Sequence, residues 1–552
     1  MFILTKSPDR AAAAMRHLCD RLPVSTGPIH RVPIGDRHLL WCRAQVRDNL
    51  HVFSDGVLIA RRSASEQLSD DPQHHGGPLP SEHPPALPGT VIRPDGTGVS
   101  VEPLGVTSAY THGDDVSDRT LLLAAMGDLR PSPKGTALLA GVGYFPGDLT
   151  LFDEVRRVPF LHRWCSADRS TRRVRTLSMP RADDEAMVER LASIVPVDVR
   201  HAVGLSGGHD SRFVLGILRR AGADVRVVRF QDRESDVASA LARQLDLEVQ
   251  SIGSFGDHDA ERTPAEFTAM TDGQIWHGVA QFGRLRQHLA PDDVFDSGQF
   301  SPSMNKNTLK TAWKKPDPRR PFWDRLVHEG FVRAVPAVQP ALRSCARREE
   351  LFEVLDPELR RQLEHVDLGT RKQTANWLYY MNRGMRWAQA YYDDLGHSAN
   401  VLFLLSDVEA QLLGLASGAW GNFHNDRFTA VNRRLLPDVD VPYSSGAPAE
   451  PPRGPAAAVQ KVRYEYLDRW KTSRTARARL EGIDTTYEEA LPEHQPKGHE
   501  ELFDRPMHEV AHLGQFGLRR ANVTVSNVLA FLESVPALPE PGTGPEEQPD
   551  AT

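Results

Sequence analysis

The stretch that most restricts which folds this chain can adopt runs from Val199 to Gly222. It begins with a short apolar run, VRHAVGL, of the kind that forms a buried parallel strand. Two adjacent glycines follow in SGGHDS, where they allow a tight turn of the backbone. The residues after the glycines place apolar side chains on one helical face, namely Phe213, Val214, Ile217 and Leu218. The sequence therefore predicts a strand, a glycine loop and a helix in succession.

The same alternation continues downstream of this helix. Residues 225–230 read as a second strand, residues 234–247 as a second helix, and residues 249–252 as a third strand. Alternating strands and helices up to about residue 446 favour an α/β fold with a parallel sheet. In such sheets ligands bind beyond the carboxyl ends of the strands, which is where the glycine loop falls.

The glycine loop has the chemistry of an anion site. Its N–H groups and those at the start of the helix point to one spot, which suits phosphate or pyrophosphate. Ser206 and Ser211 add hydroxyl donors, and the sensible partner of Asp210 is a magnesium ion that bridges phosphates. Neither the Walker pattern GxxxxGK[ST] nor the dinucleotide pattern GxGxxG is present in this stretch. A glycine-rich turn that binds no ligand is the alternative.

Composition limits the class of protein and its partners. A chain of 552 residues predicts two or three domains. The net charge of −7 gives no electrostatic case for nucleic acid or a membrane surface as a partner. The four cysteines are far apart in sequence and form no CxxC pair, so we expect reduced thiols in a cytoplasmic protein. We expect neither a signal peptide nor a membrane span, because no apolar run is long enough.

Short strand-like runs dominate the first part of the chain. They include residues 50–62, 99–112 and 137–145. The segment 70–90 is rich in Pro, Gly and His and is expected to be a loop, since its histidines show no regular metal-ligand spacing. Residues 183–194 have apolar residues at helical spacing and predict a helix.

The motifs together resemble a known family. SGGHDS, residues 206–211, resembles the SGGxDS loop of the PP-loop ATP pyrophosphatases, which cleave ATP between its α- and β-phosphates. Residues 116–125 (VSDRTLLLAA) and 143–159 (GYFPGDLTLFDEVRRVP) resemble two elements of the asparagine synthetase-like branch of that family. The resemblance covers most of residues 1–445.

This resemblance implies a domain organisation within the α/β class. Residues 1–180 would form an Ntn-type, glutaminase-like αββα domain, and residues 181–535 a parallel-sheet PP-loop synthetase domain. The tail, residues 536–552, is acidic and rich in Pro and Gly, so we expect it to be disordered.

Phe2 stands where glutamine-hydrolysing members carry a cysteine after the initiator methionine. Phenylalanine cannot form a thioester, so the glutaminase half would be degenerate and glutamine would not supply the nitrogen. In this respect the chain resembles the β-lactam synthetases and lasso-peptide cyclases.

The resemblance assigns an ATP site residue by residue. Phe230 falls near the place where the backbone of the family meets adenine, and Ser297 with Gly298 begins the second signature, SGxGxDE. The acids of that signature are missing, which implies either a weakened magnesium site or a carboxylate from Asp296 or Glu234. The residues that the resemblance places in the pyrophosphate loop are Leu205, Ser206, Gly207, Gly208, Asp210 and Ser211.

The family also uses a lysine near its carboxyl terminus to stabilise the acyl-adenylate and pyrophosphate. The candidates are Lys461, Lys471 and Lys497. Lys497 lies in LPEHQPKGH, which is similar to the Lys-Gly turn of the family. Lys497 therefore joins Asp210 as a candidate catalytic residue, and a solvated surface lysine is the alternative.

The residues that would activate the amine have changed. Family members often carry ExRxPFLD, whereas residues 400–407 read NVLFLLSD, with Asn400 in place of Glu and Leu402 in place of Arg. Asp407 is retained. Asparagine cannot serve as a general base, so the base must come from elsewhere. Upstream tyrosines offer one alternative to simple packing, namely Tyr379, Tyr380, Tyr391 and Tyr392.

Together these features predict an ATP- and Mg²⁺-dependent ligase that adenylates a small-molecule or peptide carboxylate and couples it to an amine. The product would be an amide, a lactam or a macrolactam of a specialised metabolite, and a homodimer or a biosynthetic partner protein is expected. One alternative is an ATP-binding scaffold of the same family that has lost turnover. A second is tRNA modification, which the lack of a basic surface disfavours.

Overall fold

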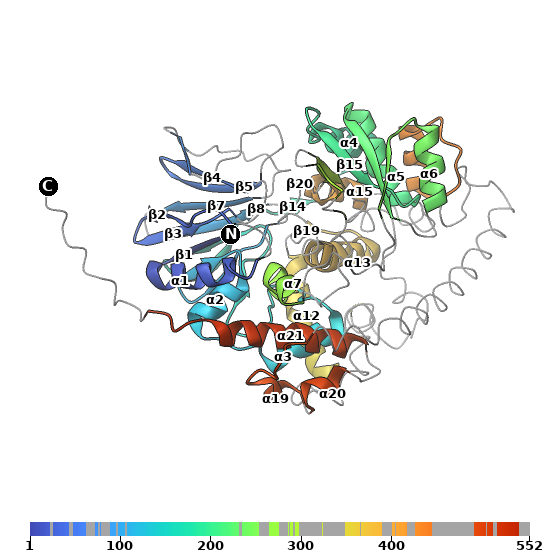
Figure 1. The fold of residues 1–552 in the computed structure, drawn as a ribbon. Helices are drawn as coiled ribbons and strands as arrows, with labels where there is room; N and C mark the ends of the chain where they lie inside the picture. Colours follow the sequence, from blue (N-terminus) through green and yellow to red (C-terminus); the bar gives the residue numbers. More distant parts are fainter. Residues whose placement is uncertain are drawn as a thin grey trace.

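The fold was determined as a computed structural model (Figure 1). The structure describes residues 1–443 and 491–539, apart from residues 23–25, 44–47, 62–71, 76–77, 79–88, 95–97, 105–106, 231–234, 253–263, 275–284, 286–287, 291–292, 297–322, 324–347, 365, 389–399, 403, 417–425, 504 and 512–515. Antiparallel and parallel sheets occur together with helices in this part of the chain, which confirms a mixed α/β fold.

Two sheets form the amino-terminal part. The first has the order β11-β9-β10-β1-β3-β2 and is antiparallel throughout. Its strands are β1 (Phe2–Thr5), β2 (His30–Ile34), β3 (Arg37–Trp41), β9 (Tyr110–His112), β10 (Asp115–Ser117) and β11 (Arg156–Arg157). The second has the order β13-β12-β8-β7-β5-β4-β6. Its strands are β4 (Asp48–Phe53), β5 (Gly56–Arg61), β6 (Gln73–His74), β7 (Gly89–Pro94), β8 (Val99–Leu104), β12 (His162–Cys165) and β13 (Ser170–Arg173).

The alternation of side chains along β1 builds the layers of this part. Phe2 and Leu4 point between the two sheets, where they pack with residues of both, including Trp41 and Trp164. Ile3 points to the other face and packs under helices α1 (Pro8–Cys19) and α2 (Thr120–Gly127). On the outer face of the second sheet a small cluster contains Leu58, Val91 and Phe53, with no described helix in it. In the described residues, two stacked sheets are therefore covered by one layer of helices. The second helical layer of the predicted αββα domain stays a prediction.

One predicted strand is wrong. Residues 137–145 read as strand-like, but helix α3 spans Pro133–Val142. The Ser132 side chain caps the helix by accepting from the Gly135 N–H at 2.9 Å, and Pro133 occupies the first turn. Gly143 ends the helix in the left-handed conformation. The run is buried on all sides, so periodicity could not separate a helix from a strand.

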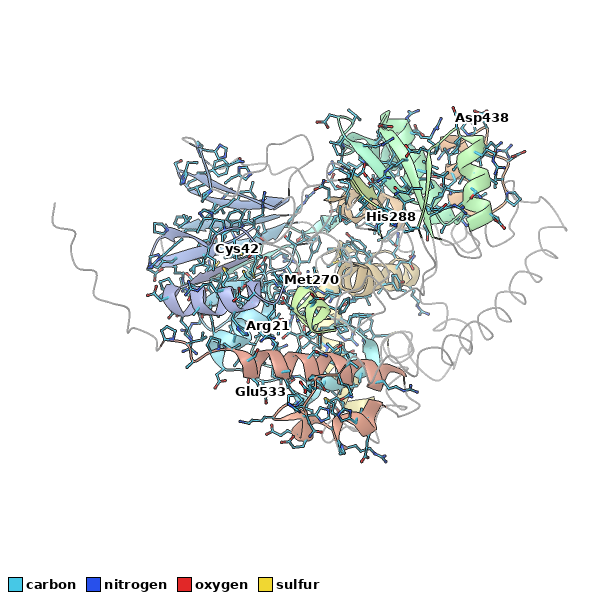
Figure 2. All side chains as sticks on the ribbon, viewed as in Figure 1. Arg21, Cys42, Met270, His288, Asp438 and Glu533 are labelled. Atoms are coloured by element: carbon cyan, nitrogen blue, oxygen red, sulfur yellow. The ribbon has the colours of Figure 1, made fainter. Side chains whose placement is uncertain are left out.

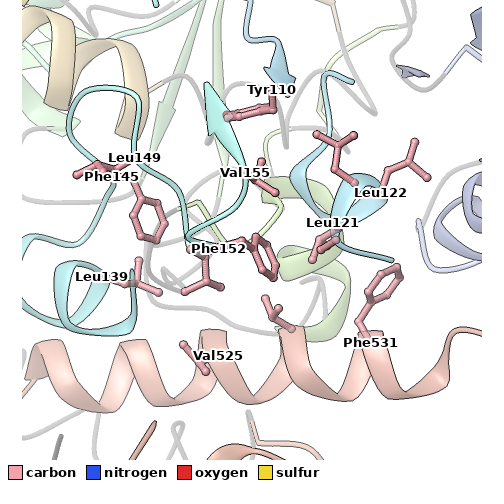
Figure 3. Close-up of a cluster of buried hydrophobic side chains, with 14 of the residues drawn as sticks. Tyr110, Leu121, Leu122, Leu139, Phe145, Leu149, Phe152, Val155, Val525 and Phe531 are labelled. Atoms are coloured by element: carbon pink, nitrogen blue, oxygen red, sulfur yellow. The ribbon is translucent and has the colours of Figure 1, made fainter. Parts of the chain in front are cut away.

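Helices from late in the sequence complete the amino-terminal core. Helix α21 (Phe516–Ser534) lies along α3 and α7 (Pro264–Thr271). In Figure 3, side chains from β9, α2, α3, residues 145–155 and α21 converge on one cluster. Helix α12 (Arg348–Leu363) adds Leu351, Leu355 and Leu359 to the same cluster. Residues after position 181 therefore contribute to the amino-terminal core as well as to a core of their own.

The end of the described chain continues beyond α21. Leu538 packs against the amino-terminal core, and Pro539 accepts a hydrogen bond from the Arg10 guanidinium at 3.3 Å. The described part of the predicted tail, residues 536–539, is thus in contact with α1, and the rest of the tail lies outside the described residues.

A five-stranded parallel sheet carries the glycine loop. Its order is β17-β16-β15-β18-β20, from strands β15 (Arg200–Gly204), β16 (Asp224–Phe230), β17 (Val249–Ile252), β18 (Val294–Asp296) and β20 (Asn400–Leu402). The helices that pack with it are α4 (Asp184–Ser193), α5 (His209–Ala221), α6 (Ser235–Gln244), α15 (Val408–Ala416) and α16 (Asp426–Leu435). The predicted strand–helix–strand–helix–strand unit and the helix predicted over residues 183–194 are confirmed.

Smaller elements connect the two regions. A two-stranded parallel sheet pairs β14 (Leu177–Ser178) with β19 (Val366–Asp367), and α13 (Arg371–Tyr379) runs on into a π-helix over Tyr380–Ala388. Helices α19 (His499–Leu502) and α20 (Met507–Ala511) pack beside α21. Among the described helices, none is both long enough and apolar enough to cross a membrane.

Candidate functional site: the glycine loop of the parallel sheet

The glycine loop joins the central strand of the sheet to a long amphipathic helix. β15 ends at Gly204, and the Leu205 N–H donates to the Val228 carbonyl at 3.0 Å, which continues the pairing with β16. Gly208 is the residue before the first turn of α5 and adopts an extended conformation. The apolar face of α5 is buried against the sheet, and Gly222 ends the helix with φ of 81°. The loop is thus fixed at both ends by ordinary secondary structure.

Gly207 is required by both its conformation and its surroundings. Its φ is +71°, in the left-handed region that side chains with a Cβ rarely adopt. A Cβ atom placed there would lie 2.6 Å from Cγ1 of Val237 on α6. The turn therefore brings the loop backbone into direct contact with the neighbouring helix.

Two serine hydroxyls organise the loop from within. The Ser211 Oγ accepts from the Ser206 N–H at 3.3 Å and lies 3.4 Å from the Ser206 Oγ. The Ser206 Oγ in turn accepts from the Gly208 N–H at 3.4 Å. Ser211 is buried, whereas Ser206 is exposed, so the Ser206 hydroxyl is the one available to a ligand.

The amino terminus of α5 gives the loop an electropositive edge. The first N–H groups of a helix have no partner within the helix, and the helix dipole adds positive potential there. Asp210 is half-buried in the first turn of α5. A carboxylate at this place stabilises the helix end by itself, and a carboxylate oxygen is also the kind of ligand that a magnesium ion takes.

The loop lies at the point where the strand order of the sheet reverses. β16 and β17 are on one side of β15, whereas the later strands β18 and β20 are on the other. In open parallel sheets this arrangement leaves a crevice at the carboxyl ends of the two central strands. β15 and β18 approach closely there, because a Cβ on Gly204 would lie 3.1 Å from the Phe295 ring.

The end of β18 is occupied by an internal ion pair. Asp296 and His201 are fully buried, and the His201 Nδ1 lies 2.8 Å from the Asp296 Oδ2. The His201 Nε2 lies 2.6 Å from the Pro196 carbonyl oxygen. The Pro196 carbonyl oxygen can only accept, so the Nε2 of His201 carries a hydrogen, and the Nδ1 is paired with the Asp296 carboxyl group. Burial opposes a charge on the ring, but the bonds to Asp296 and Pro196 outweigh it and raise the pKa of His201.

Asp296 therefore performs a structural task in this sheet. One of its oxygens is held by His201, and burial raises the pKa of its carboxyl group. Its side chain reaches back along the sheet to a residue near the amino end of β15, away from the glycine loop. The expectation that Asp296 supplies a magnesium ligand gains no support from this geometry.

An aromatic clamp that the sequence did not suggest holds the start of α5. The rings of His209 and Tyr443 are stacked with centroids 3.7 Å apart, and the Arg212 guanidinium lies 4.0 Å from the centre of the Tyr443 ring. Arg212 donates to the carbonyl oxygens of Val441 and Pro442 at 2.7 and 2.6 Å. Residues more than two hundred positions apart are involved, so no local pattern could have identified this contact.

The other predicted ATP-site residues are placed as follows. Phe230 is the last residue of β16, one strand away from the loop. Ser297, Gly298 and Glu234 lie outside the described residues. The structure thus brings the six loop residues and the end of β16 to one edge of the sheet.

Lys497 lies in a different region. It is exposed in the turn before α19, and its backbone N–H bonds to the Glu533 carboxylate on α21. Glu533 is labelled in the lower part of the view in Figure 2, whereas Asp438, whose carbonyl oxygen accepts from Gln244 of α6, is labelled at the upper right. The structure does not bring Lys497 to the glycine loop. Lys461 and Lys471 lie outside the described residues.

The described residues of the segment that replaces the amine-activating motif make contacts that hold the fold together. Asp407 accepts from the Ala410 N–H at 2.8 Å at the start of α15, and Arg190 pairs with it at 3.0 Å. The Tyr380 hydroxyl donates to the Ser406 carbonyl oxygen, and burial raises the pKa of Tyr380 far above its usual range. Asn400 is buried at the start of β20. Tyr380 is therefore a poor base, and Tyr391 and Tyr392 lie outside the described residues.

Within the described part of the chain, no three His, Cys, Asp or Glu side chains gather as metal ligands. Comparison with known proteins finds no family model and no curated protein that matches this chain.

Proposed function

We propose that this protein is an ATP- and Mg²⁺-dependent ligase that adenylates a carboxylate, releases pyrophosphate and couples the acyl group to an amine. The observation that carries the proposal is the glycine loop at the carboxyl end of β15, beside the reversal of strand order. The positive φ of Gly207 forms the turn of the loop, and beside it Ser206 is exposed and Gly208 is only partly buried, so an anion can approach the backbone there.

Different loop residues would bind different parts of the β- and γ-phosphates of ATP. N–H groups of residues 207–210 would donate to phosphate oxygens, and the exposed Ser206 hydroxyl would add a donor. Asp210 would hold the magnesium ion, which neutralises phosphate charge when bound. Such contacts stabilise the departing pyrophosphate electrostatically, and that is the largest expected contribution of the protein to this step.

We infer that the amine does not come from glutamine hydrolysis at the amino terminus. Phe2 is 1% exposed in the core between the two sheets, where it packs as a hydrophobic residue. The Met1 ammonium donates to the Cys42 carbonyl oxygen at 3.1 Å and lies 3.7 Å from Asp118. We propose that the two-sheet part is a degenerate glutaminase-like domain that serves as scaffold, and that the parallel sheet is a PP-loop synthetase domain.

Nucleotide binding without turnover is the second candidate, and two observations favour it. Asp296 is committed to His201, and Lys497 is far from the loop. Asp210 is then the only carboxylate among the described loop residues that could serve a magnesium ion.

A pyrophosphate-release assay separates the two candidates. Purified protein is incubated with ATP labelled at the γ-phosphate, Mg²⁺ and a panel of carboxylic acids with amines. Ligase activity predicts labelled pyrophosphate that is lost in Asp210→Ala. The matched control is Asp198→Ala, an exposed carboxylate beyond the amino end of β15, which should keep activity. ATP binding with no pyrophosphate across the panel supports the scaffold, and release of labelled phosphate with ADP contradicts the PP-loop assignment.

A further inference from the structure

Two cysteines far apart in the sequence lie side by side in the amino-terminal part. The Sγ atoms of Cys19 and Cys42 are 3.7 Å apart, which is a thiol–thiol contact without a disulfide. Cys19 is the last residue of α1, and Cys42 directly follows β3 (Figure 2 labels Cys42). The helix and the strand are packed together in the same hydrophobic core. Separation in sequence had hidden this pair.

The two thiols differ in how firmly they are held. Cys42 is fully buried, and its N–H donates to the Met1 carbonyl oxygen at 3.1 Å as the pairing of β1 and β3 continues. Cys19 is partly exposed at the carboxyl end of a helix, where the last turn is the part that yields most easily. We therefore expect Cys19 to make the larger part of the movement that brings the two sulfurs together.

The surroundings of Cys19 favour its thiolate form. The hydrogen bond from the Cys42 thiol lowers the pKa of Cys19 to about 7, against the opposing effect of burial. The Met1 ammonium and the Arg119 guanidinium act in the same direction. The same contact and burial raise the pKa of Cys42. These directions favour Cys19 as the sulfur that reacts first and Cys42 as the thiol that reacts second.

We propose that Cys19 and Cys42 form an oxidation site that a peroxide or a small-molecule disulfide converts into an intramolecular disulfide. With hydrogen peroxide, the Cys19 thiolate attacks one oxygen and becomes a sulfenic acid, and the other oxygen leaves as water after taking a proton. The Cys42 thiol then attacks the Cys19 sulfur, the S–S bond forms, and a second water leaves. Two thiols are oxidised by two electrons, and one peroxide is reduced to two waters.

With oxidised glutathione the same pair reacts by exchange. The Cys19 thiolate attacks a sulfur of the reagent, and one glutathione leaves as thiolate. The Cys42 thiol then displaces the second glutathione from Cys19, giving the same product. An S–S bond is about 2.0 Å long, so the sulfurs must close by about half of their present separation. The cysteine pair lies in the two-sheet part, away from the glycine loop. Because the disulfide is detected by mass, the test of this proposal does not depend on ligase activity.

Tryptic peptide mapping tests the site directly. The full-length protein is treated in its native state with oxidised glutathione, free thiols are alkylated, and the chain is digested without reductant. Arginines at positions 16, 21, 37 and 43 release HLCDR (17–21) and HLLWCR (38–43) as separate peptides. We expect one cross-linked species of these two peptides, lighter by two hydrogen atoms than their sum, that separates on reduction. Cys165→Ser is the matched control and should give the same species.

The Cys42→Ser variant adds a positive readout. Without its resolving partner, Cys19 should accumulate a stable glutathione adduct, whereas Cys19→Ser should yield neither adduct nor cross-link at this pair. If Cys42→Ser does not fold, the peptide map of the wild-type protein still tests whether the disulfide forms. A wild-type protein that keeps the adduct on Cys19 while Cys42 stays alkylatable would overturn the proposal, as would a cross-link that involves Cys165 or Cys345 instead.

Discussion

Strands β15 and β18 lie side by side in the parallel sheet but end in opposite ways. β15 continues into a loop in which Ser206 is exposed and Gly208 is partly buried. β18 ends at Asp296, which is buried and bound to His201 of β15. The end of β15, where Ser206 is exposed, is the open end, whereas the described end of β18, where Asp296 is bound to His201, is the closed end. The nucleotide chemistry that we propose therefore depends on the loop after β15.

The largest effect should come from removing one partner of the ion pair at the closed end. Asp296→Ala leaves the buried His201 without its carboxyl partner, so we expect a loss of about 3–5 kcal/mol in the free energy of unfolding. Chemical denaturation of the variant and of wild type measures the difference. The double variant with His201→Leu should recover much of the loss, because no polar group is then left buried without a partner at this place. Equal stability of Asp296→Ala and wild type would show that the pair is not formed.

The next effect concerns the clamp on the open end. Tyr443→Ala removes the ring that stacks on His209 and Arg212. Because the surrounding residues would fill the space of the ring only in part, we expect about 3 kcal/mol of destabilisation. Tyr443→Phe keeps the ring and should stay within about 1 kcal/mol of wild type. Thermal and chemical unfolding of the two variants provide the measurement. Similar losses in both would assign the effect to the hydroxyl group and not to stacking.

A smaller loss of stability, with a complete loss of function, is expected at the turn itself. Gly207→Ala places a Cβ in the left-handed region and against Val237, which costs about 1–2 kcal/mol. The loop should move away from its anion-binding conformation, so pyrophosphate release should fall below detection although the protein stays folded. Gly222→Ala is the matched control, because it has a similar φ, +81°, but open space around its Cβ. Full activity of Gly207→Ala would show that the loop conformation is not needed.

The smallest effect is a pH dependence at the closed end. The pKa of His201 is raised in the folded state, so its contribution to stability is complete below the ordinary histidine pKa and declines as pH rises through the folded value. The decline amounts to about 1.4 kcal/mol for each unit by which the pKa is raised. Wild type should therefore lose its advantage over His201→Gln as pH rises above neutrality in denaturant titrations. A difference that does not change with pH would contradict a raised pKa of His201 in the folded state.

The two strand ends also show what the sequence can predict. The strands and helices from β15 to β17 could be predicted from the sequence, because apolar periodicity and the glycines at positions 207 and 222 are visible in short stretches of residues. The helix over Pro133–Val142 was missed, since a run buried on all sides has no periodicity to read. The backbone geometry of the loop was likewise implied by its glycines.

Contacts between distant segments could not be predicted from local patterns. Asp296 looked available for a metal, but it pairs with Val203 of β15 and its side chain reaches back to the buried ring of His201. The stacking of His209 on Tyr443 and the approach of Cys19 to Cys42 depend on how helices and strands pack in three dimensions. Lys497 was chosen for its local resemblance to a turn, and the packing of α19 beside α21 places it elsewhere.

Hydrogen exchange of the backbone amides in residues 205–212 tests the central claim most directly. Exchange is followed by mass spectrometry with Mg²⁺ alone, with Mg²⁺ and ATP, and with Mg²⁺ and pyrophosphate. If the loop N–H groups hold the β- and γ-phosphates, both ligands should slow exchange in this segment by about tenfold or more, while residues 491–503 around Lys497 should be unaffected. Saturation with ATP that leaves residues 205–212 unchanged would contradict the assignment of the pyrophosphate site to this loop.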